Sequence, residues 1–259
     1  MAEMRLNVAR GFKMGTMINS VNVPPELRLK RSTGIDWVDE ALGGQGFTPT
    51  CTMMLTGGPG TGKSTLLRQL ASAMTSAGHI AVLNSGEESI FQIRMSCERL
   101  KLPCDFMIGE ETMLPVILNF LDNVKAQNPG KQICYLQDSL QCVDDGKYIN
   151  SRGESRGTTG KTPGYCAESI VSWTQANFGV SIFIGQVNKS GVFSGENKIK
   201  HAVDIHSHMY VDNDEKSETY GSLLFDVQKN RWGVCGRTYQ LKLTDTGVVA
   251  EGCFSKIKG

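Results

Sequence analysis

The chain has 259 residues, of which 40% are hydrophobic and 20% are charged, and its formal net charge is +1. This length and composition predict one large α/β domain with an ample core, or at most a domain with a small appendage. The balanced charge excludes a strongly basic nucleic-acid coat and an acidic tail, but it is compatible with a local basic groove.

Eight cysteines are scattered along the sequence without any C-x-x-C pair, so we expect reduced thiols rather than a zinc site. His201 and His208 also lack a second set of ligands at metal-binding spacing. No apolar run approaches the length of a membrane span, and the N-terminus lacks the apolar stretch of a signal peptide. The sequence therefore predicts a soluble, cytoplasmic protein without a membrane partner.

Residues 1 to about 31 show no clear periodicity and are interrupted by Pro24-Pro25. They carry six basic and two acidic residues, a local excess of four positive charges. We expect an arm that is flexible and solvated, docks on another subunit or contacts nucleic acid. The main domain is then predicted to run from residue 32 to residue 259. It begins with a short helix that has Ile35, Val38 and Leu42 on one face.

The strongest signal follows a predicted buried strand at 52–55. The sequence there is Gly57-Gly58-Pro59-Gly60-Thr61-Gly62-Lys63-Ser64-Thr65, and an amphipathic run at helical spacing comes next. Strand, G-x-x-x-x-G-K-[ST] and helix together are the phosphate-binding loop in its required context. An ordinary glycine-rich turn before a helix is the alternative, and the complete motif with both flanks argues against it.

Each part of this loop has a physical role toward a nucleoside triphosphate. The glycines let successive backbone N–H groups point at an anion, and the helix adds the positive end of its dipole. Lys63 can then reach the β- and γ-phosphates, and the Ser64 hydroxyl can ligate Mg²⁺. The sequence therefore predicts a nucleotide site with Mg²⁺ as cofactor.

Alternating strands and helices follow in chain order. Strands are predicted at 80–84, 132–137 and 180–187, and helices at about 89–100, 113–126 and 165–177. Strand-like runs at 202–211, 220–228, 238–243 and 248–254 end the chain. This order predicts an α/β fold, a mostly parallel twisted sheet flanked by helices with antiparallel strands at its C-terminal edge. Asp138 follows the third strand, where an acidic residue typically holds the Mg²⁺ of a phosphate loop.

Several segments together resemble the ATPase core of the bacterial RadA (Sms) proteins, which belong to the RecA-like ATPases. They are Ser32-Thr33-Gly34-Ile35 with Leu42-Gly43-Gly44, the phosphate loop, Ser85-Gly86-Glu87-Glu88-Ser89, and Lys229-Asn230-Arg231-Trp232-Gly233. The resemblance covers roughly 29–254, and the last segment matches the nearly diagnostic K-N-R-F-G motif with one aromatic exchange. The four-cysteine zinc element and the Lon-protease-like domain of RadA have no counterpart in this sequence. The end of the 180–187 strand also resembles that of DnaB-type helicases.

The resemblance implies ATP as the nucleotide and a role for each matching residue. Glu87 corresponds to the glutamate that polarises the attacking water, with Glu88 as the neighbouring alternative, and Gln186 to the sensor of the γ-phosphate. Lys229 and Arg231 correspond to a pair that acts in a neighbouring subunit's site. This predicts a homo-oligomer, either a ring, with a hexamer favoured, or a filament. The plainer alternatives are a helix N-terminal acid for Glu87 and a solvated edge-strand pair for Lys229 and Arg231.

Two polar, glycine-containing segments match the DNA-binding loops of RecA-like proteins. One spans 144–164 and the other runs from the end of the 180–187 strand to residue 200. Their candidate DNA-binding residues are Lys147, Arg152, Arg156, Lys161, Lys189, Lys198 and Lys200. Flexible cationic loops can follow a phosphate backbone without reading bases, which predicts single-stranded DNA as the partner. Two solvated surface loops are the alternative.

These observations favour an ATPase (hydrolase) that depends on single-stranded DNA and acts in DNA recombination and repair. It would drive translocation, branch migration or strand exchange in a bacterial or phage-infected cell. One alternative is a DnaB-type replicative DNA helicase, although such helicases usually carry an additional N-terminal domain. The other is a KaiC-like signalling ATPase that has no DNA role.

Overall fold

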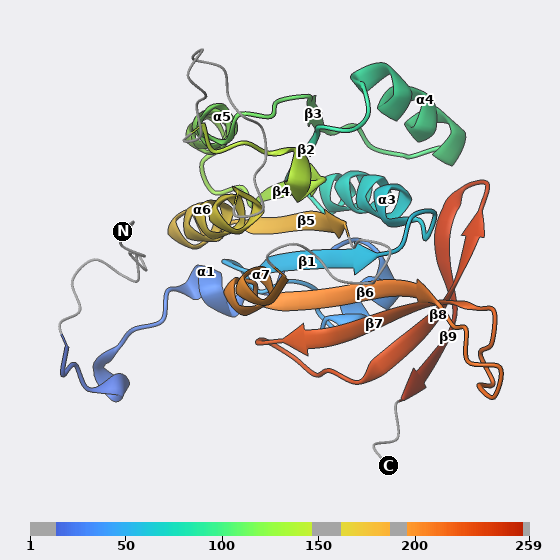
Figure 1. Cartoon of the computed structure of the whole chain (residues 1–259). Coiled ribbons are helices and arrows are strands. Elements are labelled where there is room, and N and C mark those ends of the chain that lie inside the picture. The colour runs from blue at the N-terminus through green and yellow to red at the C-terminus, as the bar shows by residue number, and fades with distance from the viewer. Residues whose placement is uncertain (1–13, 147–161, 187–195, 256–259) are drawn as a thin grey trace.

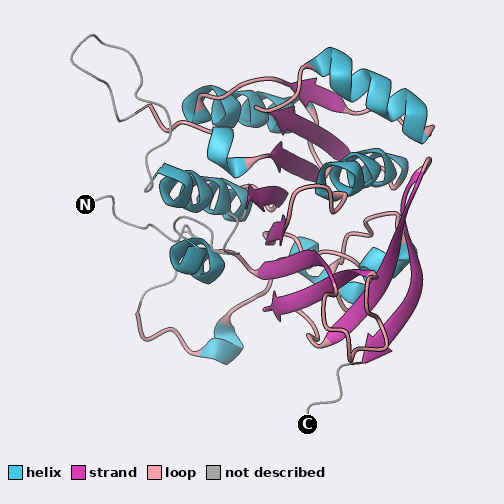
Figure 2. Cartoon of the chain, turned by 45° about the vertical axis from the view of Figure 1, so that its right-hand side comes forward, coloured by secondary structure: helices cyan, strands magenta, loops and turns pink. Residues whose placement is uncertain are grey.

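The computed structural model describes residues 14–146, 162–186 and 196–255. Within them, nine strands form one sheet in the order β3-β2-β4-β5-β1-β6-β7-β8-β9 (Figures 1 and 2). The strands are β1 (Thr52–Gly57), β2 (Ile80–Ser85), β3 (Met107–Gly109), β4 (Ile133–Asp138), β5 (Val180–Gln186), β6 (Ile205–Val211), β7 (Leu223–Asn230), β8 (Arg237–Thr244) and β9 (Gly247–Ser255). Neighbours from β3 to β6 are parallel, and those from β6 to β9 are antiparallel. The predicted fold class is confirmed.

Helices cover both faces of the sheet (Figure 1). They are α1 (Pro25–Arg28), α2 (Asp36–Ala41), α3 (Lys63–Ser76), α4 (Ile90–Leu100), α5 (Leu114–Gln127), α6 (Thr162–Ala176) and α7 (Glu196–Ala202), with 3₁₀ turns η1 (Ile18–Ser20) and η2 (Leu140–Cys142). One hydrophobic cluster joins α2, α3 and the start of α4 to the sheet, and another joins α5, α6 and α7 to the sheet. The two clusters take alternate residues of β1, Met53 and Met54, because successive side chains of a strand point to opposite faces.

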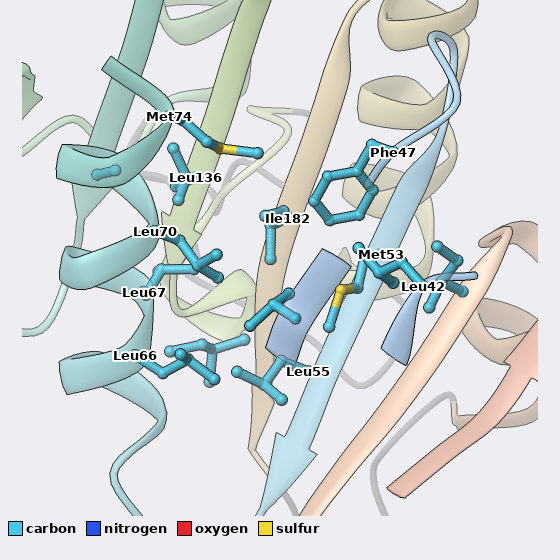
Figure 3. Packing of buried hydrophobic residues seen from close by; sticks show 14 of the residues in the cluster. Leu42, Phe47, Met53, Leu55, Leu66, Leu67, Leu70, Met74, Leu136 and Ile182 are labelled. Atoms are coloured by element: carbon cyan, nitrogen blue, oxygen red, sulfur yellow. The ribbon is translucent and has the colours of Figure 1, made fainter. Parts of the chain in front are cut away.

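The rigid centre of the molecule lies where α3 packs on the parallel strands. Leu66, Leu67, Leu70 and Met74 of α3 are at most 1% exposed, and Figure 3 shows them facing Leu55 of β1, Leu136 of β4 and Ile182 of β5. Burial of each such side chain stabilises the fold by about 1.5–3 kcal/mol. All six residues of β1 are buried as well. The loop between β1 and α3 is therefore held at both ends by buried elements of the core.

Some elements differ from the sequence-based expectation. Residues 196–202 form the helix α7 where we expected the end of a polar loop and the start of a strand, so Lys198 and Lys200 lie on a helix. The helix was missed because its segment is mostly polar, and only Ile199 together with the following Val203 anchors it in the core. Helix α6 begins at Thr162, three residues early, since its proline lies in the first turn, where proline is tolerated. Strand β3 has only three residues, too few for a periodic pattern.

The N-terminal segment changes character close to residue 30. Arg31 and Phe47 exchange two backbone hydrogen bonds of 2.7 Å, and Lys30 Nζ donates to Thr48 Oγ1 at 2.7 Å. Upstream, the side chains of Met14, Met17 and Ile18 are 76–107% exposed. The last residues of the expected arm are thus joined to the core, whereas its described earlier part presents apolar side chains to solvent. None of the helices in the described residues is long and apolar enough to cross a membrane.

Candidate nucleotide-binding and catalytic site

The phosphate loop connects the carboxyl end of β1 to the first turn of α3. Gly57 and Gly62 have φ angles of 155° and 89°, in the region that favours glycine. A Cβ at Gly57 would lie 2.3 Å from the backbone oxygen of Met209, and one at Gly62 would lie 2.5 Å from Cδ2 of Leu243. The loop is therefore wedged between β6 and β8 in a shape that only glycine permits. Its N–H groups and the start of α3 form the kind of cradle that binds phosphate.

Lys63 is held inside this loop by a backbone contact. Its Nζ donates to the backbone oxygen of Gly58 at 2.6 Å. Burial lowers the pKa of Lys63, while the nearby carboxylates of Asp138 and Glu87 raise it in part. The ammonium thus has a single protein hydrogen bond described for it, which a phosphate oxygen can replace.

Ser64 and Asp138 meet at the carboxyl ends of the central strands. The Ser64 side chain lies close enough to the Asp138 carboxylate to lower its pKa. Burial raises the pKa of Asp138, Ser64 lowers it, and the charge of Glu87 raises it further. The Ser64 hydroxyl and the partly desolvated Asp138 carboxylate, with the Glu87 carboxylate nearby, offer oxygen ligands and an excess of negative charge. They fit Mg²⁺, which is typically held by one or two protein oxygens together with phosphate oxygens and waters.

Glu87 lies at the meeting point of three strand ends. Gln186 Nε2 at the end of β5 donates to Glu87 Oε1 at 2.6 Å. The Ser139 hydroxyl donates to the same oxygen, and the Cys142 thiol contacts it at 3.8 Å. Among the contacts of the described residues, all three donors converge on Oε1. This arrangement fixes the carboxylate and leaves Oε2 to accept a proton.

The neighbouring Glu88 points elsewhere. It forms an ion pair of 2.5 Å with Arg68 of α3, whose side chain is only 7% exposed. Arg68 also donates to Ser96 Oγ of α4 at 3.2 Å. Glu88 therefore ties α3 to the beginning of α4, whereas the charge of Glu87 acts on Lys63 and Asp138. The sequence alone could not separate the two glutamates, because nothing in it reveals Arg68 as a partner.

A cavity of about 380 Å³ adjoins the outer side of the loop. It is lined by residues of the loop, by Arg68, Glu88 and Arg99, and by Leu243 and Thr244 of the β8–β9 hairpin, which reaches up beside α3 in Figure 1. The hairpin is fastened to α3 by Gln69, whose side chain exchanges two hydrogen bonds with the backbone of Val248, at 2.8 and 3.3 Å. This volume is within the range of small-molecule pockets, and its cationic residues suit an anionic ligand such as a nucleotide.

Lys229 and Arg231 lie at the opposite end of the sheet. Asn230 of β7 pairs with Ile205 of β6, which pairs with Met53 near the start of β1. The phosphate loop follows Gly57, four residues further along β1, or about 13 Å at the usual rise of a strand. The fold therefore keeps both cations away from the phosphate loop of their own chain.

Comparison with protein-family models finds no match. Among curated proteins, the chain is 32% identical over 222 residues to the DNA repair protein RadA of Mycobacterium tuberculosis, covering 83% of this chain and 42% of that protein. It is 30% identical over 222 residues to the DNA repair protein RadA of Haemophilus influenzae, covering 84% and 44%. This chain contains a RadA-like ATPase core of the RecA type. It spans less than half the length of these two relatives.

Solved structures agree with the RadA-like core at the level of the fold. A protein solved as an isolated ATPase domain superposes with a TM-score of 0.70 at 16% identity, covering 85% of this chain and 90% of that one. A DnaB-like replicative helicase, solved in a study of its interactions with primase, gives a TM-score of 0.69 at 16% identity, covering 85% and 61%. At this identity the likeness concerns only the RecA-type arrangement of the sheet and its helices.

The candidate DNA-binding residues of the RadA-like core fall mainly outside the described residues. This holds for Lys147, Arg152, Arg156, Lys161 and Lys189, and nothing is described of the Lys198 side chain. Lys200 lies in the last turn of α7. The segment 187–195 begins directly after Gln186, which contacts Glu87. The residue directly before the second expected DNA loop, Gln186, therefore contacts the candidate catalytic glutamate.

Sequence reasoning missed Ser139 and Cys142. Both belong to the turn after β4 and contact Glu87, which is more than fifty residues away in sequence. Gly86 packs against the same turn, since a Cβ there would lie 2.4 Å from that of Cys142. A Ser directly after the strand-end Asp138 is the signal that could have identified this contact, because neighbouring parallel strands end at the same edge.

Proposed function

We propose that this RadA-like core is an ATPase stimulated by single-stranded DNA, that it works as a homo-oligomer, and that it drives a DNA transaction in recombination or repair. The observation that carries the proposal is the hydrogen bond from Gln186 to Glu87 beside the phosphate loop. It connects the expected DNA loop that follows β5 to the expected catalytic carboxylate. The similarity to proteins named DNA repair protein RadA supports the same function.

Nucleotide binding uses groups that are already in place. The glycine-rich backbone and the start of α3 receive the phosphates, and Lys63 exchanges the Gly58 oxygen for oxygens of the β- and γ-phosphates. Ser64 and Asp138 would hold Mg²⁺, which when bound neutralises charge on the phosphate oxygens. The hairpin residues of the adjoining cavity enclose the remainder of the nucleotide.

Hydrolysis then depends on Glu87. Its carboxylate orients a water for attack on the γ-phosphorus and accepts the water's proton at Oε2 as the bond to the β-phosphate oxygen breaks, giving ADP and phosphate. Ser139 and Gln186 hold the other carboxylate oxygen throughout. Movement of Gln186 when DNA binds the following segment would change the position of Glu87. This gives the DNA loop a direct means to regulate hydrolysis.

The positive charge that phosphoryl transfer requires is completed by a neighbour. A guanidinium can donate two hydrogen bonds to γ-phosphate oxygens, and Arg231 cannot reach its own phosphate loop. We therefore assign the finger role to Arg231 of an adjacent subunit. A closed ring would provide this arrangement for every subunit, and a filament would provide it for every subunit except one at an end.

The test is ATP turnover with and without single-stranded DNA, together with DNA affinity over a range of salt concentrations. We expect stimulation by DNA, and we expect it to be lost in Gln186→Ala but kept in Gln127→Ala, a control at the exposed end of α5. Turnover indifferent to DNA and no salt-dependent binding would favour the KaiC-like alternative. Directional duplex unwinding would favour the DnaB-type helicase, the second candidate, which the DnaB-like fold neighbour supports.

A further inference from the structure

Asp204 is a buried carboxylate at the end of the sheet far from the phosphate loop. It is 3% exposed and lies between the end of α7 and the start of β6. Its Oδ2 accepts the Thr52 N–H at 3.0 Å, and its own N–H donates to the Thr52 oxygen at 2.9 Å. A buried charge destabilises a fold unless it is paired and hydrogen-bonded. The backbone of β1 satisfies one oxygen of this carboxylate and fixes its position.

The other oxygen of Asp204 pairs with Arg231. Arg231 Nη1 lies 3.3 Å from Oδ1, and the Arg231 backbone N–H donates to the Asp204 backbone oxygen at 3.1 Å. Arg231 Nη2 also donates to the backbone oxygen of His201 at 2.8 Å. A guanidinium carries five N–H donors, so these contacts occupy only part of its capacity. The Arg231 side chain is 48% exposed, which leaves its outer edge in reach of another molecule.

Lys229 is held by the end of α7. Its Nζ donates to the backbone oxygens of Lys200 and Val203 at 2.6 Å each, and to that of His201 at 3.2 Å. Burial lowers the pKa of Lys229, the charge of Arg231 lowers it further, and Asp204 raises it. Three carbonyls around one ammonium form a fixed anchor. The side chain of Lys229 is thus turned into its own subunit.

The turn that carries these two cations is fixed against α2. Asn230 Oδ1 accepts the Trp232 N–H at 2.9 Å, and Asn230 Nδ2 donates to the Leu42 oxygen at 3.4 Å. A Cβ at Gly233 would lie 2.8 Å from that same Leu42 oxygen. The K-N-R-W-G motif therefore forms a rigid turn in which the lysine, asparagine and glycine hold the backbone while the arginine projects.

We propose that Asp204 and the backbone oxygen of His201 form a seat that positions Arg231 for the site of a neighbouring subunit. The carbonyl groups at the end of α7 support this seat by holding Lys229. In this seat Asp204 is a positioning residue, and Lys229 anchors the turn to the end of α7. The proposal rests on the function proposed above, in which Arg231 acts in trans.

The first test is Asp204→Asn, which keeps an oxygen for the Thr52 N–H but removes the charge that holds Arg231. Misplacement of a catalytic group lowers turnover by up to about 100-fold. We expect kcat to fall about 10–100-fold while ATP affinity stays within about twofold of the native protein. Glu40→Gln is the matched control, because it removes the carboxylate of the Glu40–Arg237 ion pair, an exposed pair with an N–O distance of 2.6 Å. The control should retain native turnover.

Mixed oligomers distinguish positioning of a trans-acting group from local structural damage. Asp204→Asn subunits keep an intact phosphate loop, and Lys63→Ala subunits keep an intact seat, so some mixed interfaces are complete. We expect mixing to restore activity to the level given by Arg231→Ala mixed with Lys63→Ala. If the Arg231→Ala mixture recovers and the Asp204→Asn mixture does not, Asp204 acts only within its own subunit and the seat proposal is wrong. If neither mixture recovers although mixed assembly is verified, Arg231 does not act in a neighbouring subunit, and both the proposed function and the seat proposal are wrong.

A second variant covers the case in which Asp204→Asn does not fold. Lys229→Met removes the ammonium that binds α7 but leaves the Asp204 contacts with β1 and Arg231 intact. We expect lowered kcat, retained ATP affinity and recovery on mixing with Lys63→Ala. Native turnover in Lys229→Met would contradict the seat proposal. The proposal would also be wrong if Lys229→Met loses turnover and mixing it with Lys63→Ala does not restore it, while the mixture of Arg231→Ala with Lys63→Ala recovers.

Discussion

The two ends of strand β1 hold cations in different ways. At the carboxyl end, Lys63 Nζ contacts one backbone oxygen, that of Gly58 at 2.6 Å. At the amino end, Lys229 Nζ contacts three, and Arg231 is paired with the buried Asp204. The first lysine can leave its single partner for a ligand, whereas the second is built into the fold. This difference supports the proposal that one end binds an anion and the other presents an arginine.

Removing Lys63 should have the largest effect. In Lys63→Ala the γ-phosphate loses the cation placed inside the loop, so we expect ATP hydrolysis to be abolished and most nucleotide affinity to be lost. Calorimetric nucleotide titration and a steady-state phosphate assay measure both quantities. Turnover close to that of the native protein would show that this end of β1 is not the nucleotide site.

Removing the presented arginine should separate binding from turnover. Arg231→Ala leaves the phosphate loop untouched, so ATP affinity should persist while kcat falls by about a thousandfold. Specific activity of the native protein should rise with protein concentration as subunits associate. A variant that loses ATP binding together with turnover would mean that Arg231 supports its own subunit instead of a neighbour.

The adjacent glutamates sharpen the comparison within the phosphate-loop end. Glu87→Gln should bind ATP but hydrolyse it at least about 100-fold more slowly, because the amide cannot accept the proton. Glu88→Gln leaves the buried Arg68 without its counter-charge, so thermal stability should fall while turnover is kept at temperatures where the variant is folded. If Glu88→Gln is the inactive variant instead, the catalytic role has been assigned to the wrong carboxylate.

The sequence predicts one end of β1 far better than the other. The phosphate loop is a contiguous motif, Asp138 was predicted from its place after a strand, and Glu87 and Gln186 were predicted from the resemblance to RadA. The parallel strands bring all three to one edge of the sheet. Asp204 gave no signal, because its partners Thr52 and Arg231 are 152 and 27 residues away. Helix α7 could not be predicted because its segment is mostly polar. The ion pair of Arg68 with Glu88 could not be predicted because it depends on the packing of α4 on α3.

A smaller effect is expected for the residues 147–161, which lie outside the described part of the chain. Replacing Arg152, Arg156 and Lys161 together by alanine removes three expected phosphate contacts. The slope of log affinity for single-stranded DNA against log salt should fall by about 2, or about 0.7 per contact. Hydrolysis without DNA should be unchanged. An unaltered slope would identify the three as ordinary surface charges.

The smallest effect concerns stability at the phosphate-loop end. Because burial raises the pKa of Asp138 above its value in the unfolded chain, the protonated form is stabilised by folding and ionisation at neutral pH destabilises the protein. Without nucleotide, Asp138→Asn should raise Tm at pH 7, by about 2–4 °C for each kcal/mol of stability regained. This gain should shrink as the pH falls through the two pKa values. The exposed Asp245→Asn serves as a control that leaves Tm unchanged, and an equal gain there would refute the burial argument.

The central claim is that the phosphate loop of one subunit and Arg231 of another form one active site. The most direct test mixes Lys63→Ala with Arg231→Ala, each nearly inactive alone, and measures ATP turnover with single-stranded DNA. In a random equal mixture, about one interface in four joins an intact loop to an intact finger, so turnover should return to about a quarter of the native value. No recovery at any ratio, with mixed assembly verified by sedimentation, would contradict a site shared between subunits.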